Sequence, residues 1–289
     1  MTSEWMTIRA ADFIHFNPRL SIKKGEMATK VGMDRLLPFT KKIPSIEQAV
    51  FTGGTKFSNG DTIMARITPC LENGKTAFVD ILKDGEVGFG STEYIVMRAK
   101  EGISDPQFVY YLATSPFFRN IAIKSMVGSS GRQRVQQVVL DELILTVPRK
   151  VEDQAKIGRV LSELDDKIAL NNEVNDNLMQ QAVTIFKSWF VEYSPFNGIE
   201  PKEWETVNLE KITSLISRGI APKYSDNSDQ IVINQKCIRN HMIDLSQART
   251  HTPKVINEKW LRFGDLLINS TGDGTLGRAA QVWFQPQNI

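Results

Sequence analysis

The clearest pattern along the chain is a run of apolar positions that recurs every three or four residues between 157 and 189. Alternating steps of four and three are typical of a coiled-coil helix, because they place the apolar side chains along one seam. Two asparagines interrupt the seam midway, as buried polar layers that fix helix register commonly do. At ~1.5 Å per residue, the pattern predicts a helical rod of about 60 Å within 151–194. The seam positions are Ile157, Leu161, Leu164, Ile168, Asn171, Asn175, Leu178, Ala182, Ile185 and Trp189.

One long helix packed across two domains is the alternative interpretation of this pattern. Such a helix would still act as a spacer of fixed length. The Ser-Pro-Phe-Asn-Gly segment at 194–198 contains helix-breaking residues and predicts the end of the helix.

The first 150 residues predict a mixed α+β domain. Short apolar or β-branched segments bounded by Gly and Asn predict strands. Asp105-Pro106 predicts a helix start, since Asp caps free backbone N–H groups and Pro is tolerated in the first turn. Ser115-Pro116 predicts a break, and 124–134 is a loop rich in Gly and Ser. The predicted strands span 62–67, 77–82, 93–97 and 143–147.

Three short segments recur in the same order later in the chain, at offsets of 199, 204 and 203 residues. Three collinear matches predict a duplication, although any single one would be expected by chance. Position 289 maps onto about position 86 of the first copy, so we expect the sequence to stop partway through the second copy. The matches are Glu4-Trp5-Met6-Thr7-Ile8 with Glu203-Trp204-Glu205-Thr206-Val207, Gly60-Asp61-Thr62-Ile63 with Gly264-Asp265-Leu266-Leu267, and Gly74-Lys75-Thr76-Ala77-Phe78-Val79 with Gly277-Arg278-Ala279-Ala280-Gln281-Val282.

Composition narrows the class of protein. A chain of 289 residues with 41% hydrophobic and 24% charged residues suits about two globular domains. The net charge of +2 permits nucleic acid as a partner without arguing for it. Two distant cysteines predict neither a disulfide framework nor a cysteine zinc site, which favours a reducing cytoplasm. No apolar stretch approaches the ~20 residues of a membrane span, and no secretory signal is visible.

The sequence offers no catalytic constellation. Its glycine clusters lack the spacing of phosphate-binding loops, and the three histidines are isolated from one another. Glu72 lies near Lys75 without a second carboxylate in convincing context, and Asp165-Asp166 is expected to be a solvated face of the helix. We therefore expect no catalysis by the chain alone, no cofactor and no metal site.

Basic residues do cluster on loops. Lys124, Arg132 and Arg134 share their loop with glycines, serines and Gln133, a mixture suited to phosphate contact. Arg pairs with guanine and Gln with adenine, so Arg132 or Gln133 could equally reach base edges. Arg66, Lys75 and, in the second copy, Arg278 are further DNA-binding candidates. The alternative is that these are ordinary surface cations that aid solubility.

Two segments carry a family resemblance. The first is Leu143-Ile144-Leu145-Thr146-Val147-Pro148, then Glu152-Asp153-Gln154 with Ile157, Leu161, Leu164-Asp165 and Ile168. It resembles the junction of type I restriction–modification specificity subunits, where a strand ending in proline leads into a helix that begins with Glu-x-Gln. The second is the Gly-Ser-Ser-Gly-Arg-Gln-Arg-Val loop at 128–135, which with the Gly-Asp-Thr-Ile and Gly-Lys-Thr-Ala marks resembles the target recognition domains of that family. The resemblance covers essentially the whole chain and is most specific at 143–170.

The resemblance implies a subunit that reads DNA without catalysis of its own. In that family, two target recognition domains are held apart by antiparallel helices, and each reads one half of a split double-stranded DNA sequence. The helices also dock methyltransferase (modification) subunits, and a restriction subunit that translocates DNA joins for cleavage. By this resemblance, 1–150 is the first target recognition domain, 151–194 the spacer helix, and 195–289 a partial second recognition domain.

The chain departs from the family pattern because the second copy has no loop matching 124–134 and no long helix of its own. The heptad seam is therefore left without an intramolecular partner. Because exposing each Leu or Ile side chain forgoes ~1.5–3 kcal/mol, we expect the seam to find another surface. An antiparallel, two-fold homodimer and a methyltransferase subunit are the two expected occupants.

Two other classes of function remain open. A protein-interaction scaffold would use the heptad helix as its whole function and would show no DNA selectivity. A self-contained methyltransferase or nuclease is disfavoured, since Asn17-Pro18-Arg19-Leu20 is not an Asn/Asp-Pro-Pro-aromatic motif.

Overall fold

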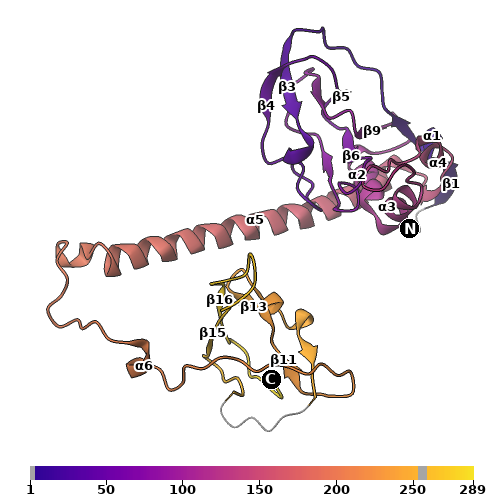
Figure 1. The fold of residues 1–289 in the computed structure, drawn as a ribbon. Helices are drawn as coiled ribbons and strands as arrows, with labels where there is room; N and C mark the ends of the chain where they lie inside the picture. Colours follow the sequence, from indigo (N-terminus) through magenta and orange to yellow (C-terminus); the bar gives the residue numbers. More distant parts are fainter. Residues whose placement is uncertain (1–3, 253–258) are drawn as a thin grey trace. The chain divides into compact units, whose positions relative to one another are not determined.

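The computed structural model describes residues 4–252 and 259–289, which form two compact units, 1–192 (unit 1) and 193–289 (unit 2). Each unit is described by itself (Figure 1). Both mix short strands with helices, so the expected α+β class is confirmed. Unit 1 contains β1 (Trp5–Arg9), α1 (Ala10–Phe13), β2 (Ile14–Phe16), β3 (Met27–Val31), β4 (Glu47–Val50), β5 (Thr55–Phe57), β6 (Thr62–Ala65), β7 (Thr76–Phe78), β8 (Gly88–Gly90), β9 (Tyr94–Ala99), α2 (Pro106–Thr114), α3 (Pro116–Lys124), α4 (Gln137–Asp141), β10 (Ile144–Pro148) and α5 (Val151–Phe190).

Unit 1 is built on two four-stranded sheets, ordered β2-β9-β6-β7 and β4-β3-β8-β5, and the two-stranded pair β1-β10. β3 and β8 run parallel, and the other pairs are antiparallel. On β9, Ile95 packs into a core with the helices, whereas Val96 packs into a second core with β3 and β5. Because β6 and the first four residues of β9 are buried on both faces, apolar residues run consecutively at 63–65 and 94–97 instead of alternating.

The predicted helix signals are confirmed. The Asp105 carboxylate accepts a hydrogen bond from the N–H of Phe108 at 2.9 Å, and α2 begins directly after Asp105, at Pro106. Ser115 interrupts the helical path and its hydroxyl accepts the N–H of Phe118 at 3.2 Å, so α3 starts there. Each cap satisfies a backbone donor that the first helical turn leaves open.

The long predicted helix is present as α5, 40 residues from Val151 to Phe190, or about 60 Å. It follows directly from β10, which pairs antiparallel with β1 in the register Trp5↔Pro148. A short 3-10 turn at Ser194–Phe196 comes after the helix. No helix of the described residues is both long and apolar enough to cross a membrane.

Unit 2 repeats the backbone of the β6–β7 hairpin in β15 and β16. The N–H of Gly60 bonds to the carbonyl of Val79 at 2.8 Å, and Gly264 bonds to Val282 at the same distance. These equivalent hydrogen bonds strongly support the duplication inferred from sequence. The elements of unit 2 are α6 (Leu209–Ile212), β11 (Ile231–Val232), β12 (Ile238–Arg239), β13 (Met242–Ile243), β14 (Arg249–Thr250), β15 (Leu266–Ile268) and β16 (Ala279–Gln281).

The first matched segment behaves differently in the two units. Residues 4–8 lie mostly in β1, but 203–207 form no strand. In unit 1 this strand pairs with β10, whereas among the described residues 203–207 pair with no strand. A single strand without its partner leaves its backbone groups unpaired, which explains the difference.

Candidate nucleic-acid interface

The predicted DNA-contacting loop lies between α3 and α4 and has a firmly bonded base. Val127 and Arg134 exchange two backbone hydrogen bonds, with N···O distances of 3.1 and 2.9 Å. Val135 donates its N–H to the carbonyl of Arg66, directly after β6, at 2.9 Å. Residues 128–133 therefore extend from a base that is tied to the central sheet.

Arg134 is part of that base. Its Nη2 lies 2.7 Å from Oε1 of Glu93, and its Nε donates to both carboxylate oxygens at 3.0 Å. These hydrogen bonds hold the pKa of the Glu93 carboxyl below its usual range. The guanidinium is committed to Glu93, so the structure places Arg134 as a support of the loop.

Arg66 and Lys75 also bond within unit 1. Nη2 of Arg66 donates to the carbonyl of Val135 at 3.1 Å, and Nζ of Lys75 donates to the carbonyl of Met33 at 2.8 Å. Both residues are half-buried. Nε of Arg66 is buried and has no hydrogen-bond partner among the described residues. These two cations join neighbouring segments and present little of their charge to the surface.

Lys124, Arg132 and Gln133 are the predicted site residues whose side chains remain available. Lys124 and Arg132 are exposed and Gln133 is half-buried. Within the described part of the chain, none of the three side chains forms a hydrogen bond or an ion pair. The loop thus offers two cations and one amide to an incoming phosphate or base edge.

Arg278, the candidate of unit 2, lies on the turn that leads into β16. Its Nη2 donates to the carbonyl of Gly274 at 2.7 Å, and the residue is exposed. The duplication places it at the position of Lys75, but its bond stays within its own turn, whereas Lys75 reaches a segment 42 residues away. 

A pair formed by a half-buried arginine and an exposed aromatic ring was missed by sequence reasoning. The guanidinium of Arg119 lies 4.9 Å from the ring centroid of Phe39, and Nη2 donates to the carbonyl of Glu72 at 2.5 Å. Phe39 is 71% exposed, in a left-handed conformation with φ 53°. A Cβ on Gly74 would come within 2.6 Å of the ring, so only glycine fits there. Exposed aromatic and arginine faces stack well on nucleic-acid bases, but no sequence pattern marks Phe39 as exposed.

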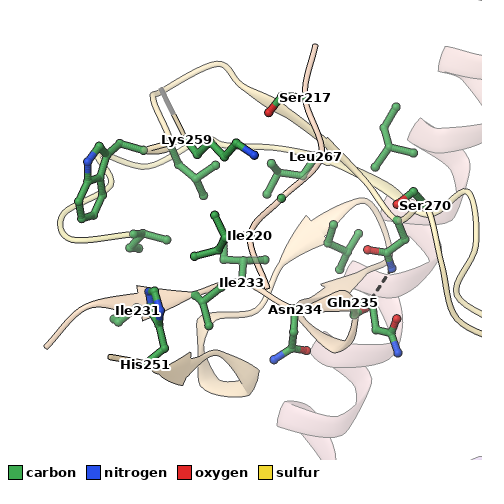
Figure 2. Close-up of a pocket in the computed structure, with 18 of the residues that line it drawn as sticks. Ser217, Ile220, Ile231, Ile233, Asn234, Gln235, His251, Lys259, Leu267 and Ser270 are labelled. Atoms are coloured by element: carbon green, nitrogen blue, oxygen red, sulfur yellow. Dashed lines mark hydrogen bonds between the residues drawn. The ribbon is translucent and has the colours of Figure 1, made fainter. Parts of the chain in front are cut away.

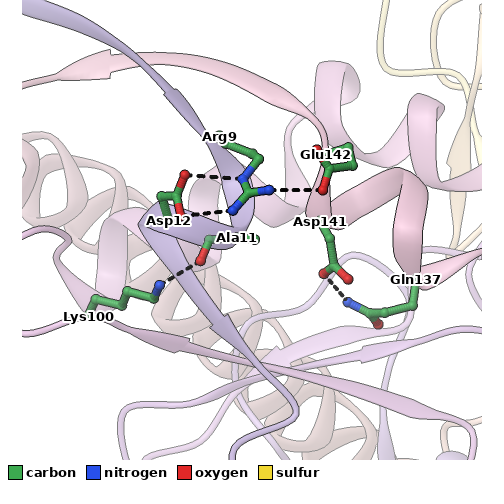
Figure 3. Close-up of polar contacts among 7 residues, drawn as sticks. All are labelled: Arg9, Ala11, Asp12, Lys100, Gln137, Asp141 and Glu142. Carbon is green, nitrogen blue, oxygen red and sulfur yellow. Dashed lines mark hydrogen bonds and ion pairs between the residues drawn. The ribbon is translucent and has the colours of Figure 1, made fainter.

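A polar hollow of about 310 Å³ was also missed. It lies between β2 and α4 and is lined by His15, Asn17, Lys100 and Gln137, among others. Figure 3 shows that Lys100 donates to the carbonyl of Ala11, 2.5 Å away. An adjoining hollow of about 380 Å³ shares Asn17 and adds Arg19 and Lys56. Three chain segments that are distant in sequence converge here, so no local sequence pattern shows this clustering.

Beside the first hollow, Arg9 links the start of α1 to the end of α4. Its Nε lies 3.1 Å from Asp12 and its Nη1 3.0 Å from Glu142, both at the surface (Figure 3). Exposed ion pairs of this kind contribute little to stability. They place the carboxylates of Asp12 and Glu142 opposite a cation, whereas Asp141, which lines the hollow, accepts a hydrogen bond from Gln137 at 2.8 Å.

The junction motif fixes the start of α5 to the rest of unit 1. Gln154 is fully buried; its Oε1 accepts the N–H of Asp105 at 3.0 Å, and its Nε2 donates to the carbonyls of Ile103 and Pro148 at 3.1 and 2.9 Å. One turn later, a Cβ on Gly158 would lie 2.8 Å from that of Gln107 in α2. The amide and the glycine together clamp the start of the helix against α2.

The expectation of a solvated Asp165-Asp166 face is wrong for Asp165, which is half-buried, whereas Asp166 is exposed. Asp165 accepts a hydrogen bond from the Tyr111 hydroxyl at 2.7 Å, and Asp166 lies 3.0 Å from Nζ of Lys42. Burial, with the neighbouring Asp165, raises the pKa of Tyr111 well above its usual value. Nearby, Lys41 donates to the Ser162 hydroxyl at 2.7 Å. Tyr111, Lys41 and Lys42, which lie elsewhere in unit 1, therefore bond to this stretch of α5. Local sequence cannot show these contacts.

Beyond this clamp the heptad seam is uncovered. Every residue from 171 to 187 is exposed, and Leu178 and Ile185 are 57% and 58% exposed. Ile157 and Leu164 are also exposed, at 38% and 57%, whereas Leu161 is half-buried. The remaining seam positions, Ile168, Asn171, Asn175, Ala182 and Trp189, are exposed.

The comparisons with known proteins all point to the same family. A model described as the type I restriction modification DNA specificity domain matches residues 2–180. The HindI specificity subunit of Haemophilus influenzae is 32% identical over 171 residues, which is 57% of this chain and 35% of that protein. The MjaVIII specificity subunit of Methanocaldococcus jannaschii is 22% identical over 283 residues, 93% of this chain and 62% of that protein. The chain thus spans only part of the length of these relatives.

A solved structure from a study of complex assembly and conformational transition of the type I R-M system shares the fold. Its TM-score is 0.50 at 16% identity, covering 97% of this chain and 73% of that one. Among the described residues, no group of three or more His, Cys, Asp or Glu side chains is arranged to hold a metal ion.

Proposed function

Because the chain belongs to the type I restriction modification DNA specificity domain family, we propose that it is the DNA-reading component of a type I restriction–modification complex. In this role the chain makes or cuts no bond itself and acts in the cytoplasm, where its DNA target lies. Unit 1 reads one part of a split double-stranded sequence. Methyltransferase subunits, and a restriction subunit in the full complex, supply the chemistry.

The hydrogen-bonded junction between the start of α5 and the rest of unit 1 is the observation that carries this proposal. The family match at 2–180 runs through unit 1 and most of that helix. A spacer sets a distance only if its end is fixed, and buried Gln154 fixes this end through three hydrogen bonds. The unpaired side chains of Lys124, Arg132 and Gln133 then provide the DNA contacts.

Selection of DNA from a random pool tests the function. The chain is purified with a type I methyltransferase subunit, and the bound duplexes are sequenced. We expect enrichment of a motif with a defined half-site. A pool that stays random, with the complex intact, would instead favour the interaction scaffold.

Salt dependence tests the loop itself. Replacing Lys124 and Arg132 by Ala should lower the slope of log K against log [salt] by about 2, since each phosphate contact contributes ~0.9. The double replacement of Lys156 and Lys167 on α5 removes the same charge and should leave the slope unchanged. Equal slopes for the two variants would remove the loop from the interface. 

We also propose that the uncovered seam of α5 is the docking surface for partner helices. Its exposed Leu and Ile side chains would each gain ~1.5–3 kcal/mol on burial. In the absence of other subunits, two copies of the chain that pair through antiparallel α5 helices bury the apolar seams of both helices. Such a dimer presents two copies of unit 1. Such a dimer reads a two-fold-symmetric split sequence.

Sedimentation at micromolar concentration tests this pairing. The wild-type chain should sediment as a dimer, and Leu178→Asp with Ile185→Asp should return it to a monomer. Asp substitutions at Asn177 and Gln181, on the same helix but outside the seam, serve as the control. A wild-type chain that stays monomeric would refute self-pairing while leaving the methyltransferase as the occupant.

A further inference from the structure

A surface tip of unit 1 holds a phenylalanine in an unusual backbone conformation. The tip, residues 37–39, comes shortly after the 3-10 turn at Met33–Arg35, and all three of its residues are exposed. Phe39 is 71% exposed and has φ 53°, in the left-handed region that bulky side chains rarely adopt. Strained residues of this kind persist where their surroundings hold them, and they cluster at sites that contact ligands.

The ring of Phe39 is held from the side of the domain. The N–H of Phe39 donates to the carbonyl of Gly74 at 3.0 Å, and a Cβ on Gly74 would come within 2.6 Å of the ring. Arg119 lies against the ring, and its Nη2 donates to the carbonyl of Glu72 at 2.5 Å. The orientation of the ring is therefore fixed, while most of its surface stays open to a ligand.

The same conformation recurs in unit 2. The 3-10 turn at Gln235–Cys237 corresponds to Met33–Arg35 at an offset of 202 residues. At the same offset His241 corresponds to Phe39, and it has φ 59°. Both residues are exposed and both carry a planar ring. The left-handed, ring-bearing residue is thus a property of the repeated unit.

Both 3-10 turns are anchored at the equivalent carbonyl. In unit 1, Nζ of Lys75 donates to the carbonyl of Met33 at 2.8 Å. In unit 2, Nδ2 of Asn269 donates to the carbonyl of Gln235 at 3.0 Å, beside a hollow of about 350 Å³ (Figure 2). Each donor lies in the turn of the repeated hairpin, between β6 and β7 or between β15 and β16. The hairpin therefore fixes the start of the tip in both units.

The tip and the predicted DNA-contacting loop of unit 1 are attached to one segment, 66–75. Near one end of this segment the N–H of Thr68 donates to the carbonyl of Gln133 in the loop at 3.0 Å, and near the other end Gly74 accepts the N–H of Phe39. Six residues span at most about 21 Å, which is less than one turn of B-DNA at ~34 Å. The two attachment points therefore lie within one helical turn of a bound duplex.

We infer that Phe39 is a stacking wedge, whose ring inserts beside a base of the bound DNA and unstacks that base from its neighbour. This inference rests on the proposed DNA-reading function. Apolar side chains such as Phe, Leu and Pro open base steps in this way, and residues 37–39 supply all three. Stacking on a base adds affinity that does not depend on phosphate charge, so it complements the contacts of Lys124 and Arg132.

The surroundings of the tip favour a nucleobase over an apolar protein surface. Arg119 lies against the ring, and the exposed cations Lys124 and Arg132 belong to the loop at the other end of segment 66–75. The only carboxylate in the sequence of that segment is Glu72. Its Oε1 accepts a hydrogen bond from the Thr68 hydroxyl at 3.2 Å, and its Oε2 is buried. Cations gathered around an aromatic ring attract a polyanion whose bases can stack.

The affinity of the complex for DNA tests the wedge. The full chain is purified with a type I methyltransferase subunit, and the probe is the duplex that the wild-type complex enriches from the random pool. Phe39→Gly removes the ring and suits the left-handed backbone, so the melting temperature should stay within about 4 °C of the wild-type value. The dissociation constant should rise roughly 5- to 150-fold, as for the loss of one stacked base, with an unchanged salt slope because the ring carries no charge.

Two further variants separate stacking from a general loss of apolar surface. Phe39→Trp keeps a stacking face and should bind the duplex as the wild type does. Phe117→Ala is the matched control, because it removes another exposed ring, 52% exposed, two residues before Arg119 on α3 and therefore on a different face of that helix. This variant should also bind as the wild type does.

Photo-cross-linking identifies the stacked base directly. Each pyrimidine of the enriched duplex is replaced in turn by its 5-iodo derivative, which bonds to an aromatic ring stacked on it under long-wavelength ultraviolet light. Mass spectrometry of the digested complex should place a cross-link on Phe39 from one or two adjacent positions.

Each outcome bears on the wedge. Weaker binding by Phe39→Gly alone, together with the cross-link at Phe39, supports it. Equal affinity of Phe39→Gly and the wild type for a duplex that the wild type enriches would overturn the wedge and leave the DNA-reading function standing. Loss of the methyltransferase subunit from Phe39→Gly would also overturn it, because the ring would then be a protein contact. A wild-type complex that enriches no motif would overturn the proposed function together with this inference.

Discussion

Replacing Gln154 by Ala should loosen α5 from the rest of unit 1 and destabilise the domain. The substitution removes the acceptor of the Asp105 N–H and the donor to the carbonyls of Ile103 and Pro148, all at a position with no solvent exposure. Each buried group left unpaired costs ~1–3 kcal/mol, and the three are coupled, so we expect a total loss of about 3 kcal/mol or more. For a unit of this size that corresponds to a fall of ~6–12 °C in melting temperature.

The measurement is thermal and urea unfolding of the full chain, with exchange at the Asp105 amide as the local readout. Gln181→Ala is the matched control, because Gln181 lies on the same helix and is exposed. Its loss should change stability by less than ~0.5 kcal/mol. Similar melting temperatures for the two variants, with the Asp105 amide still protected, would refute the view that the junction motif clamps the helix.

Three further substitutions probe the loop base, the helix contact and the buried ion pair. The pKa of Glu93 is lowered by its hydrogen bonds to Arg134, so the ion pair is intact at neutral pH and is lost as the pH falls through that lowered pKa. The NMR resonance of the Arg134 Nε should shift over that pH range in the wild type. In the Glu93→Gln variant the same resonance should not change with pH. A wild-type resonance without this titration would contradict the pairing. Gly158→Ala should cost about 1–3 kcal/mol in urea unfolding because its Cβ would meet α2, whereas Gly53→Ala, with nothing within 4 Å, should be nearly neutral. Asp61→Asn should lower the free energy of unfolding by about 3 kcal/mol, since it breaks the ion pair with Arg98 at 2.7 Å. Asp265 occupies the equivalent position in unit 2 and has no ion pair with an arginine among the described residues, so Asp265→Asn should change the free energy of unfolding little. Equal losses for the two variants would argue against a role for the Asp61–Arg98 pair.

The core elements were readable from sequence because their causes are local. Asp105 and Ser115 each supply an acceptor within three residues of the N–H they cap, and proline follows both of them. The period of the seam specifies a helix without reference to any neighbour, and α5 is found where the period predicts it. The duplication was also visible, since the residues that shape a hairpin turn recur with the hairpin.

The candidate site was only partly readable, because charge in a sequence does not show which cations are already paired. Arg134 and Lys124 look equivalent in the loop, but among the described residues only Arg134 is paired, with the Glu93 carboxylate 41 residues away in sequence. Asp165 looked like solvent-facing charge until α2 brought Tyr111 to it. Exposure of Phe39, and the meeting of Asn17, Lys100 and Gln137 around one hollow, likewise depend on segments that are distant in sequence.

The sequence by itself determined the helix, its seam, the order of the repeated hairpin and the family to which these belong. Local dihedral preferences and side-chain periodicity act within a few residues, so their outcome is fixed before any long-range contact forms. Only the tertiary structure decided which cations stay available and why Gln154 must be buried. These outcomes follow from which distant groups meet, and the free energy of a buried hydrogen bond or ion pair exists only once they have met.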